Sequence, residues 1–560
     1  MPPRPRNEQV EQAPRVLRHD GYLPIREYAV IGDGRTAALV ALDGRIDWLC
    51  LPDLDSPSVF AAALDADRGG SFCLEPEDPY EVVHRYEPDT NVLQRTFTTA
   101  DSVVRITDAM PLPGPELAPA RELARSVDGL AGRVAMRWRV EPRLDYGRRQ
   151  PSISVRAGVP VATSGRLALA VVNWNAGEPQ CEPGSIGGRF EVAAGESALL
   201  ALAAAHQEPL VFPTRRQVEA RLDATRAFWR EWAAARTYSG PWREAVVRSA
   251  LALKLLMHAP SGAIAAAATA SLPEQIGGER NWDYRFCWVR DAAFTLAGLL
   301  SVGCPHEADA FFWWLLHASQ LTHPRMQVLY RLDGRADTAE QTLDLSGYTN
   351  SRPVRIGNQA LDQRQLDIYG DYMQTGWPYQ RAGGRLDADT ARRLAETADL
   401  VCQIWREPDS GIWEVRSAPT HFTQSKMMCW LALRRATQLA DAGSLPARRA
   451  ALWRAEAASI RQFVERNCWS ERLGATCASP GARSSTPAYC LLSSSGTAMR
   501  ASPDWPQRSM PSVPNWVTAR FFTAISAKMA SAAARAHSSA APSGWSRRWL
   551  GRGGSRKQPR

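Results

Sequence analysis

The first part of the chain, from about residue 21 to residue 212, alternates apolar and polar positions in short segments. Val104 and Ile106 alternate with polar neighbours, and so do Ile153 and Val155. Gly, Pro and Asp residues interrupt these segments about every 8–12 residues. Because successive side chains of a strand point to opposite faces of a sheet, this pattern predicts an amino-terminal antiparallel β-sandwich over residues 21–212.

After Pro213 the apolar residues follow one another at intervals of three or four positions. This spacing is shown by Val218, Leu222, Thr225, Trp229 and Trp232, and it predicts an amphipathic helix in a linker over residues 213–240. Further helices are expected near 241–258, 289–302, 305–321, 360–377, 387–406, 424–441 and 447–467. Repeated helical hairpins with long loops predict a toroid or solenoid of helices over 241–482, in which the loops carry the chemistry.

One motif near the amino terminus resembles a phosphate-binding loop. GDGRTA, residues 32–37, matches the glycine pattern of dinucleotide-binding proteins, but the sequence ALVALDGRIDWL follows it. That sequence contains two apolar segments around an Asp43–Gly44 turn, whereas dinucleotide binding requires a helix at this point. The motif therefore predicts a β-hairpin.

Composition indicates a large folded protein whose charge is unevenly distributed. The 560 residues are 45% apolar and carry a net charge of +9, which would suit an anionic partner. However, residues 483–560 contain twelve Lys or Arg residues and a single acidic residue, Asp504. Residues 1–482 are therefore nearly neutral, and nucleic-acid binding through the basic segment remains only a disfavoured alternative.

The two ends of the chain are residues 1–20 and 483–560, and the second of them shows no lasting helical or strand period. We expect the first to be disordered. The second is rich in Ser, Ala and Arg, and it is interpreted either as translation in a shifted reading frame or as a natural disordered tail.

Several functional classes are disfavoured by the sequence. The first twenty residues lack the apolar core of a signal peptide, and no apolar run is long enough to span a membrane, so we expect a soluble, cytoplasmic protein. The ten cysteines are scattered, as expected for reduced thiols. No metal-binding, phosphate-loop or nucleophile-elbow motif occurs, and we expect no metal and no cofactor.

The densest cluster of candidate functional residues is PEQIGGERNWDYRFCWVRDA, residues 273–292. Tyr284, Trp282 and Trp288 offer flat apolar faces, and Arg290 and Asp291 place a donor beside an acceptor. Sugars require this mixture, because their C–H faces stack on aromatic rings while their hydroxyls need paired donors and acceptors. The alternative is an aromatic core cluster with a local ion pair.

A second cluster, WREPDSGIWEVR at residues 405–416, places Glu414 directly after Trp413. A carboxyl group against an indole ring is desolvated, which raises its pKa towards the value that a general acid needs. A surface ion pair between Glu414 and Arg416 is the alternative. A third segment, residues 347–371, supplies polar groups at a junction between a loop and a helix: Arg352, Arg355, Asn358, Gln365 and Asp367.

Together these segments resemble glycoside hydrolase family 15, a glucoamylase-like family that also contains bacterial trehalases. The matching motifs are RNWDYRFCWVRDA, GIWEVR, GYTNSRPVRIGN and QLDIYGD, and the amino-terminal YEPDTNVLQRTF resembles the sandwich domain of the bacterial branch. The resemblance covers about residues 22–477. It implies a β-sandwich followed by an all-α (α/α)6 toroid-type barrel built from six helical hairpins.

The resemblance also implies a reaction and roles for residues. Glu414 would be the general acid, and Arg290 and Asp291 would clamp the hydroxyls of a glucose ring. Tyr284, Trp288 and Trp413 would line the pocket. The implied reaction in carbohydrate metabolism is inverting hydrolysis of a terminal α-glucosidic bond in a small substrate, trehalose or a short α-glucan, without metal or organic cofactor.

The chain departs from the family pattern near its carboxyl end. The family's general base lies in a late loop, but the last glutamate here is Glu471, and Asp504 is the only later carboxylate. About seven helices are recognisable, whereas six hairpins need twelve. We therefore expect an incomplete barrel without its general base, and an enzyme with impaired activity; a catalytically inactive carbohydrate-binding homologue is the alternative. Substrate linkage and oligomeric state remain open.

Overall fold

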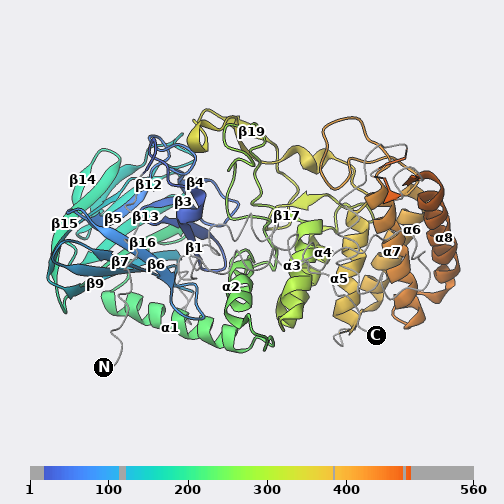
Figure 1. The fold of residues 1–560 in the computed structure, drawn as a ribbon, viewed down its shortest axis with the longest axis horizontal. Coiled ribbons are helices and arrows are strands. Elements are labelled where there is room, and N and C mark those ends of the chain that lie inside the picture. Colours follow the sequence, from blue (N-terminus) through green and yellow to red (C-terminus); the bar gives the residue numbers. More distant parts are fainter. Residues whose placement is uncertain (1–17, 113–120, 382–384, 471–474, 478, 481–560) are drawn as a thin grey trace, which may run out of the picture.

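The computed structural model describes residues 18–112, 121–381, 385–470, 475–477 and 479–480. Within these ranges an amino-terminal half of strands adjoins a carboxy-terminal half of helices (Figure 1). The expected order of an antiparallel sheet-rich part followed by a helical part is thus confirmed. The segment 483–560, Asp504 and most of the segment 1–20 lie outside the described residues.

The amino-terminal half consists of two antiparallel sheets (Figure 1). The first has the order β1-β2-β3-β5-β10-β15-β14, with β4 paired to β3; the second has the order β11-β12-β13-β16-β9-β8-β7-β6. The strands are β1 Tyr28–Gly32, β2 Ala37–Ala41, β3 Ile46–Cys50, β4 Ser58–Phe60, β5 Phe72–Pro76, β6 Glu81–Tyr86, β7 Leu93–Thr98, β8 Val103–Ala109, β9 Arg121–Ala131, β10 Arg133–Val140, β11 Ser152–Arg156, β12 Val159–Ser164, β13 Leu167–Trp174, β14 Gln180–Glu182, β15 Ser185–Ala193 and β16 Ser197–His206.

The burial of individual strands follows their sequence patterns. In β10, Val134, Met136 and Trp138 are buried between more exposed neighbours, as expected for a strand with one solvated face. Strand β16 has no such alternation because both of its faces are covered. Its Leu200 packs in the core between the sheets, whereas Leu199 packs beneath helix α1.

Helix α1, Arg215–Ala234, lies along the second sheet (Figure 1). It begins with a capping box, in which the Thr214 side chain accepts a hydrogen bond from the Gln217 N–H and the Gln217 side chain accepts one from the Thr214 N–H. Its Val218 and Leu222 are buried against β16. The amphipathic spacing seen in the sequence is thus explained by a helix that covers a sheet.

Seven further α-helices follow within the described residues, and Figure 1 shows them side by side in the second half of the molecule. They are α2 Arg243–Lys254, α3 Val289–Ser301, α4 Pro305–Ala318, α5 Ile368–Arg381, α6 Ala388–Ile404, α7 Thr423–Asp441 and α8 Ala450–Asn467. Short elements between and after them are β17 Cys287–Trp288, β18 Leu329–Tyr330, β19 Gln341–Leu343, β20 Val354–Ile356, β21 Trp469–Ser470 and β22 Ala475–Thr476. Helix α3 packs on α5, α5 on α7, and α7 on α8.

The helix expected over residues 360–377 starts later than the sequence indicated. A short 3-10 helix, Gln359–Asp362, is capped by Asn358, and α5 begins only at Ile368. The backbone at Gln363 is extended and separates the two elements. The four polar residues DQRQ, 362–365, cover this break between Leu361 and Leu366.

The two halves meet along strands β1 to β3. These strands form antiparallel hairpins, so the GDGRTA segment is a turn between β1 and β2, as expected. On the face away from the sandwich core, Leu39 and Trp48 pack against Leu345 and Val354 from the long loop that precedes α5. The Trp48 indole N–H donates to the Ala268 carbonyl oxygen at 2.9 Å. The loops of the helical half therefore rest on the first sheet.

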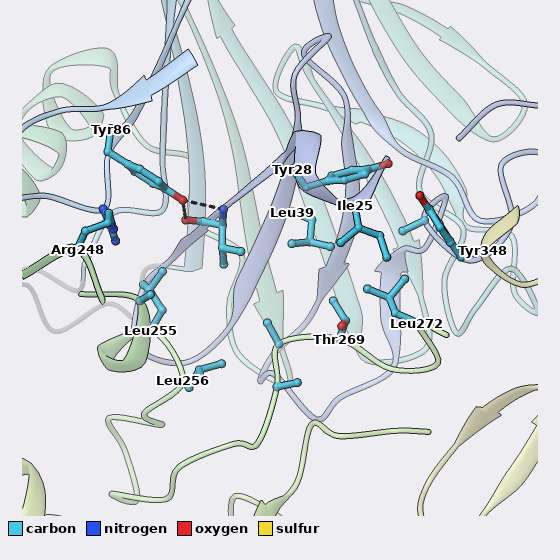
Figure 2. A pocket seen from close by; sticks show the side chains of 15 residues that line it. Ile25, Tyr28, Leu39, Tyr86, Arg248, Leu255, Leu256, Thr269, Leu272 and Tyr348 are labelled. Atoms are coloured by element: carbon cyan, nitrogen blue, oxygen red, sulfur yellow. Dashed lines mark hydrogen bonds between the residues drawn. The ribbon is translucent and has the colours of Figure 1, made fainter. Parts of the chain in front are cut away.

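This junction contains a cavity of about 90 Å³ (Figure 2). Its walls are mostly aliphatic and aromatic, with Leu39 and Tyr28 from the sheet side and Leu255 from the end of α2. The hydroxyl of Tyr86 donates to the Val30 carbonyl oxygen at 2.8 Å. The cavity is therefore a largely apolar space in which neighbouring side chains lack full packing.

Replacing Leu39 by Ala should enlarge this cavity and destabilise the junction. Large-to-small substitutions of buried leucines cost about 2–5 kcal/mol, because apolar contacts are lost and the site collapses only partly. Differential scanning calorimetry should show a lowered unfolding temperature. The matched control is Val83→Ala at an exposed position of β6, which should change stability by less than about 0.5 kcal/mol. Equal effects of the two substitutions would contradict the assignment of Leu39 to the junction.

Candidate active site

The candidate site lies where the start of α3 meets the loop that follows α6. Trp288 ends the short strand β17, which pairs with β18 and holds the indole ring in a buried position. Arg290 and Asp291 follow in the first turn of α3. Glu414 comes from the other segment, and the fold brings it to Trp288 and Arg290 across more than 120 positions of sequence.

Glu414 is held by two donors. Its Oε1 accepts a hydrogen bond from the Trp288 indole N–H at 2.7 Å and lies 3.3 Å from Nη2 of Arg290. Its backbone has φ of +54°, a left-handed conformation that is unusual for a residue other than glycine. The Gln363 side-chain amide donates to the Glu414 carbonyl oxygen at 3.2 Å and helps to hold this backbone.

The pKa of Glu414 is raised above its usual value. Burial is the largest cause, because it penalises the charged carboxylate; Arg290 opposes the shift, and the negative charge of Asp291 adds to it. A carboxyl group with a raised pKa can remain protonated close to neutral pH and donate its proton to an oxygen atom. About one fifth of the side chain is exposed, so a small molecule can approach it.

Arg290 is the centre of the site. Its guanidinium lies 2.9 Å from Oδ2 of Asp291, and Nη1 donates to the Ile412 carbonyl oxygen at 2.8 Å. One guanidinium thus joins the start of α3 to the loop that carries Glu414. Together with Asp291, it presents hydrogen-bond donors next to an acceptor, which is the combination that vicinal hydroxyl groups need.

The aromatic residues expected at the site differ in their exposure to solvent. The rings of Tyr284 and Trp288 are 5.6 Å apart between centroids and form one wall beside Glu414. Trp413 is different, since 58% of this residue is exposed to solvent. The structure therefore brings together Tyr284, Trp288 and the charged residues, and leaves Trp413 at the surface.

Arg416 does not pair with Glu414, so that alternative is wrong. Its guanidinium lies 2.8 Å from Glu340 and 4.2 Å from the centroid of the Trp282 ring. Arg355 approaches the same ring at 4.5 Å and the same carboxylate at 3.4 Å. This cluster of Trp282, Glu340 and two arginines holds the loops around the site together. Arg416 contacts Glu340, and Arg290 contacts Glu414.

Two buried carboxyl groups at the start of α5, Asp367 one residue before the helix and Asp371 in its first turn, belong to the same electrostatic environment. Asp367 and Asp371 are almost fully buried and both act on Arg290. Gly370 lies between them, and a Cβ atom there would come within 2.6 Å of the Met428 carbonyl oxygen. The glycine therefore permits the close approach of α5 to α7. From the sequence, Asp367 is expected only as a polar group and Asp371 has no expected role, although their spacing of four places them on one helix face.

The other polar groups of the third segment mostly have structural roles. Asn358 caps the 3-10 helix and donates to the Asp283 carbonyl oxygen at 3.3 Å. Arg355 donates to the Glu279 carbonyl oxygen at 2.7 Å. In the described part of the chain, no group of three or more His, Cys, Asp or Glu side chains is arranged to hold a metal ion. Among the same residues, no helix is long and apolar enough to cross a membrane.

Comparisons with known proteins agree with this architecture. Residues 240–511 match the model of glycosyl hydrolases family 15, and residues 15–174 match the model of a trehalase-like, N-terminal domain. The first match extends past residue 482 into the basic segment.

Two similar relatives are trehalases. The trehalase of Thermoplasma volcanium is 35% identical over 433 residues, which cover 75% of this chain and 67% of the relative. The trehalase of Mycolicibacterium smegmatis is 35% identical over 490 residues, 79% of this chain and 70% of the relative. A bacterial glucoamylase complexed with acarbose has a similar structure, with a TM-score of 0.56 at 10% identity; the likeness covers 82% of this chain and 70% of that one and shows a shared fold.

Replacing Trp288 by Phe should raise the pKa of Glu414 further. The indole N–H stabilises the carboxylate form, so its loss favours the protonated form by about one pKa unit, the lower end of what a hydrogen bond to a charged group contributes. The pKa can be measured from the infrared difference between each protein and its Glu414→Gln variant. The matched control is Trp314→Phe, because the Trp314 indole N–H has no hydrogen-bond partner among the described residues. A shift in the control, or none in Trp288→Phe, would contradict the assignment.

Proposed function

Because the chain belongs to glycosyl hydrolases family 15, we propose that this glycoside hydrolase acts on the terminal α-glucosidic bond of trehalose or a short α-glucan. Curated relatives at 32–36% identity are trehalases, and this supports a small α-glucoside as the substrate. The observation that carries the proposal is the partly buried Glu414 between Trp288 and Arg290, a carboxyl group whose pKa is raised as a proton donor requires.

In this proposal Glu414 is the general acid. It protonates the oxygen of the scissile bond, the C–O bond to the leaving sugar breaks, and water attacks the anomeric carbon from the opposite face. Arg290 and Asp291 hold the hydroxyls of the glucose ring that is cleaved off. Tyr284 and Trp288 form the pocket wall, and Trp413, with its exposed ring, would contact the sugar at the solvent side.

The attacking water also needs a base, and we assign none among the described residues. In inverting enzymes the base lies roughly 6.5–9.5 Å from the acid, so that a water molecule fits between the reactive groups. The last glutamate of the chain is Glu471. We propose that this chain hydrolyses its substrate slowly for this reason, and that its helices form an incomplete (α/α)6 barrel.

Replacing Glu414 by Gln should abolish most of the hydrolysis of trehalose or maltose. General acid catalysis contributes about 10²–10⁴-fold, so a loss of that size is expected in the rate of glucose release. The matched test uses α-glucosyl fluoride, whose fluoride leaving group needs little protonation. Its hydrolysis should fall much less than that of trehalose, whereas a merely structural role of Glu414 would reduce both rates equally.

Two outcomes would overturn parts of this proposal. A turnover number for the unmodified chain in the ordinary enzyme range of about 1–10³ s⁻¹ would contradict impaired activity. Calorimetric binding of trehalose without any glucose release would identify the chain as a sugar-binding homologue. Proton NMR of the products provides the stereochemical check. When water attacks the anomeric carbon of an α-glucoside with inversion, the glucose released is the β-anomer.

A further inference from the structure

Two carboxyl groups lie one helical turn apart at the start of α5 and are removed from solvent. Asp367 is fully buried, and 3% of Asp371 is exposed. The Asp371 N–H donates to the Asp367 carbonyl oxygen at 3.3 Å, which places the two residues on the same side of the helix. Two carboxylates this close in a buried environment repel each other strongly, so both do not ionise together at neutral pH.

The cation that faces both groups, Arg290, is already engaged. It contacts Asp291 at 2.9 Å and Glu414 at 3.3 Å, and it donates to a backbone carbonyl as well. Two carboxyl groups, those of Asp291 and Glu414, therefore contact this guanidinium, and Asp367 and Asp371 act on it from farther away. Because an unbalanced buried charge is costly, the cluster must keep some of its carboxyls protonated.

The hydrogen bonds distinguish Asp367, just before α5, from Asp371 within the helix. Oδ2 of Asp367 accepts a hydrogen bond from the Gln424 side-chain amide at 3.3 Å, which favours a negative charge on Asp367. Oδ1 of Asp367 and Oδ2 of Asp371 have no hydrogen-bond partner among the described residues, so the bond from Gln424 is what separates the two groups. In agreement, burial raises the pKa of Asp367 to about 6, and burial together with the neighbouring Asp367 raises the pKa of Asp371 well above its usual value.

Other charges near this pair come from the loop after α6 and from α7. Asp409 faces Asp367 and opposes its ionisation. Lys426 lies near Asp409, but its ammonium group donates to the carbonyl oxygens of Trp405 and Glu407, at 2.6 and 2.5 Å. Arg290 therefore remains the main positive charge for the pair on α5.

We propose that Asp367 and Asp371 form a positioning pair that carries one proton, held by Asp371, and that the negative charge on Asp367 opposes ionisation of Glu414. The pair acts through Arg290 and touches no reacting atom. The negative charge of Asp367 partly offsets the positive charge of the Arg290 guanidinium, so Arg290 stabilises ionised Glu414 less. Glu414, the proposed acid, therefore stays in its protonated form. This inference rests on the proposed function, in which Glu414 donates the proton.

The first measurement uses the full chain with aspartate labelled by ¹³C at the side-chain carboxyl. Infrared spectra at pH 7 should contain the band of a protonated aspartic acid, and the intensity of this band should decrease in Asp371→Asn. It should persist in Asp367→Asn, because burial is the largest cause of the raised pKa of Asp371 and remains when Asp367 is replaced. Absence of the band from the unmodified chain would overturn the proposal, whatever the variants do. If Asp371→Asn fails to fold, Asp371→Ser replaces it.

The second measurement is the pKa of Glu414 in each variant, from the infrared difference against the same protein with Glu414→Gln. Asp367→Asn removes a negative charge, so the pKa of Glu414 should fall by roughly one unit. Asp371→Asn replaces a neutral group by another neutral group and should leave the pKa within about 0.3 units. Equal shifts in the two variants, or no shift in either, would overturn the proposal.

These infrared measurements need no turnover and therefore separate the two proposals. If the Asp367→Asn shift appears while Glu414→Gln hydrolyses trehalose normally, the charge pair is supported and the proposed role of Glu414 fails. If hydrolysis depends on Glu414 but the two Asn variants behave alike, the function stands and the positioning pair is refuted. Circular dichroism and thermal unfolding of each variant confirm that the comparison is made between folded proteins.

Discussion

A buried ion pair between Arg285 and Asp283 holds the site to the amino-terminal half. The two side chains make a double contact, with Nη2 of Arg285 2.7 Å and Nε 2.9 Å from the carboxylate oxygens of Asp283. Nη1 of Arg285 also donates to the Ser56 carbonyl oxygen at 2.6 Å, and Asp283 accepts from the Gly357 N–H at 3.1 Å. Removing one partner of such a pair costs about 3–5 kcal/mol, because the other charge stays buried without compensation.

This pair explains why a strand-rich half accompanies the helices. Arg285 precedes Arg290 by five residues, so the contact with Ser56 fixes the segment that enters α3. Its guanidinium also lies within 6 Å of the centroids of the Trp48 and Tyr146 rings, which belong to the sandwich. The sandwich thus works as a support for the loops of the site, and the position of Arg290 depends on residues more than 200 positions earlier in the sequence.

Periodicity predicted the order of elements well, because strands and helices bury one face each and the sequence records which face. The alternation of β10 and the spacing of α1 are examples. Motif spacing also identified the segments that carry Arg290 and Glu414. Sequence did not show that Arg416 would pair with Glu340, since that contact joins segments 76 positions apart. Nor did it reveal Asp371, whose importance lies in its burial next to Asp367 and Arg290.

Because a cavity lies between the two halves, hydrostatic pressure affects their junction more than it affects either core. When water enters such a space, the total volume of protein and solvent decreases, so hydrostatic pressure favours the state in which the halves have separated. The sandwich core and the core that contains the helices consist of buried side chains, and protein interiors of this kind are close-packed and resist this effect. Moderate pressure should therefore first weaken the contacts that support the segment before α3. The geometry of the site would then change at a pressure at which both halves are still folded.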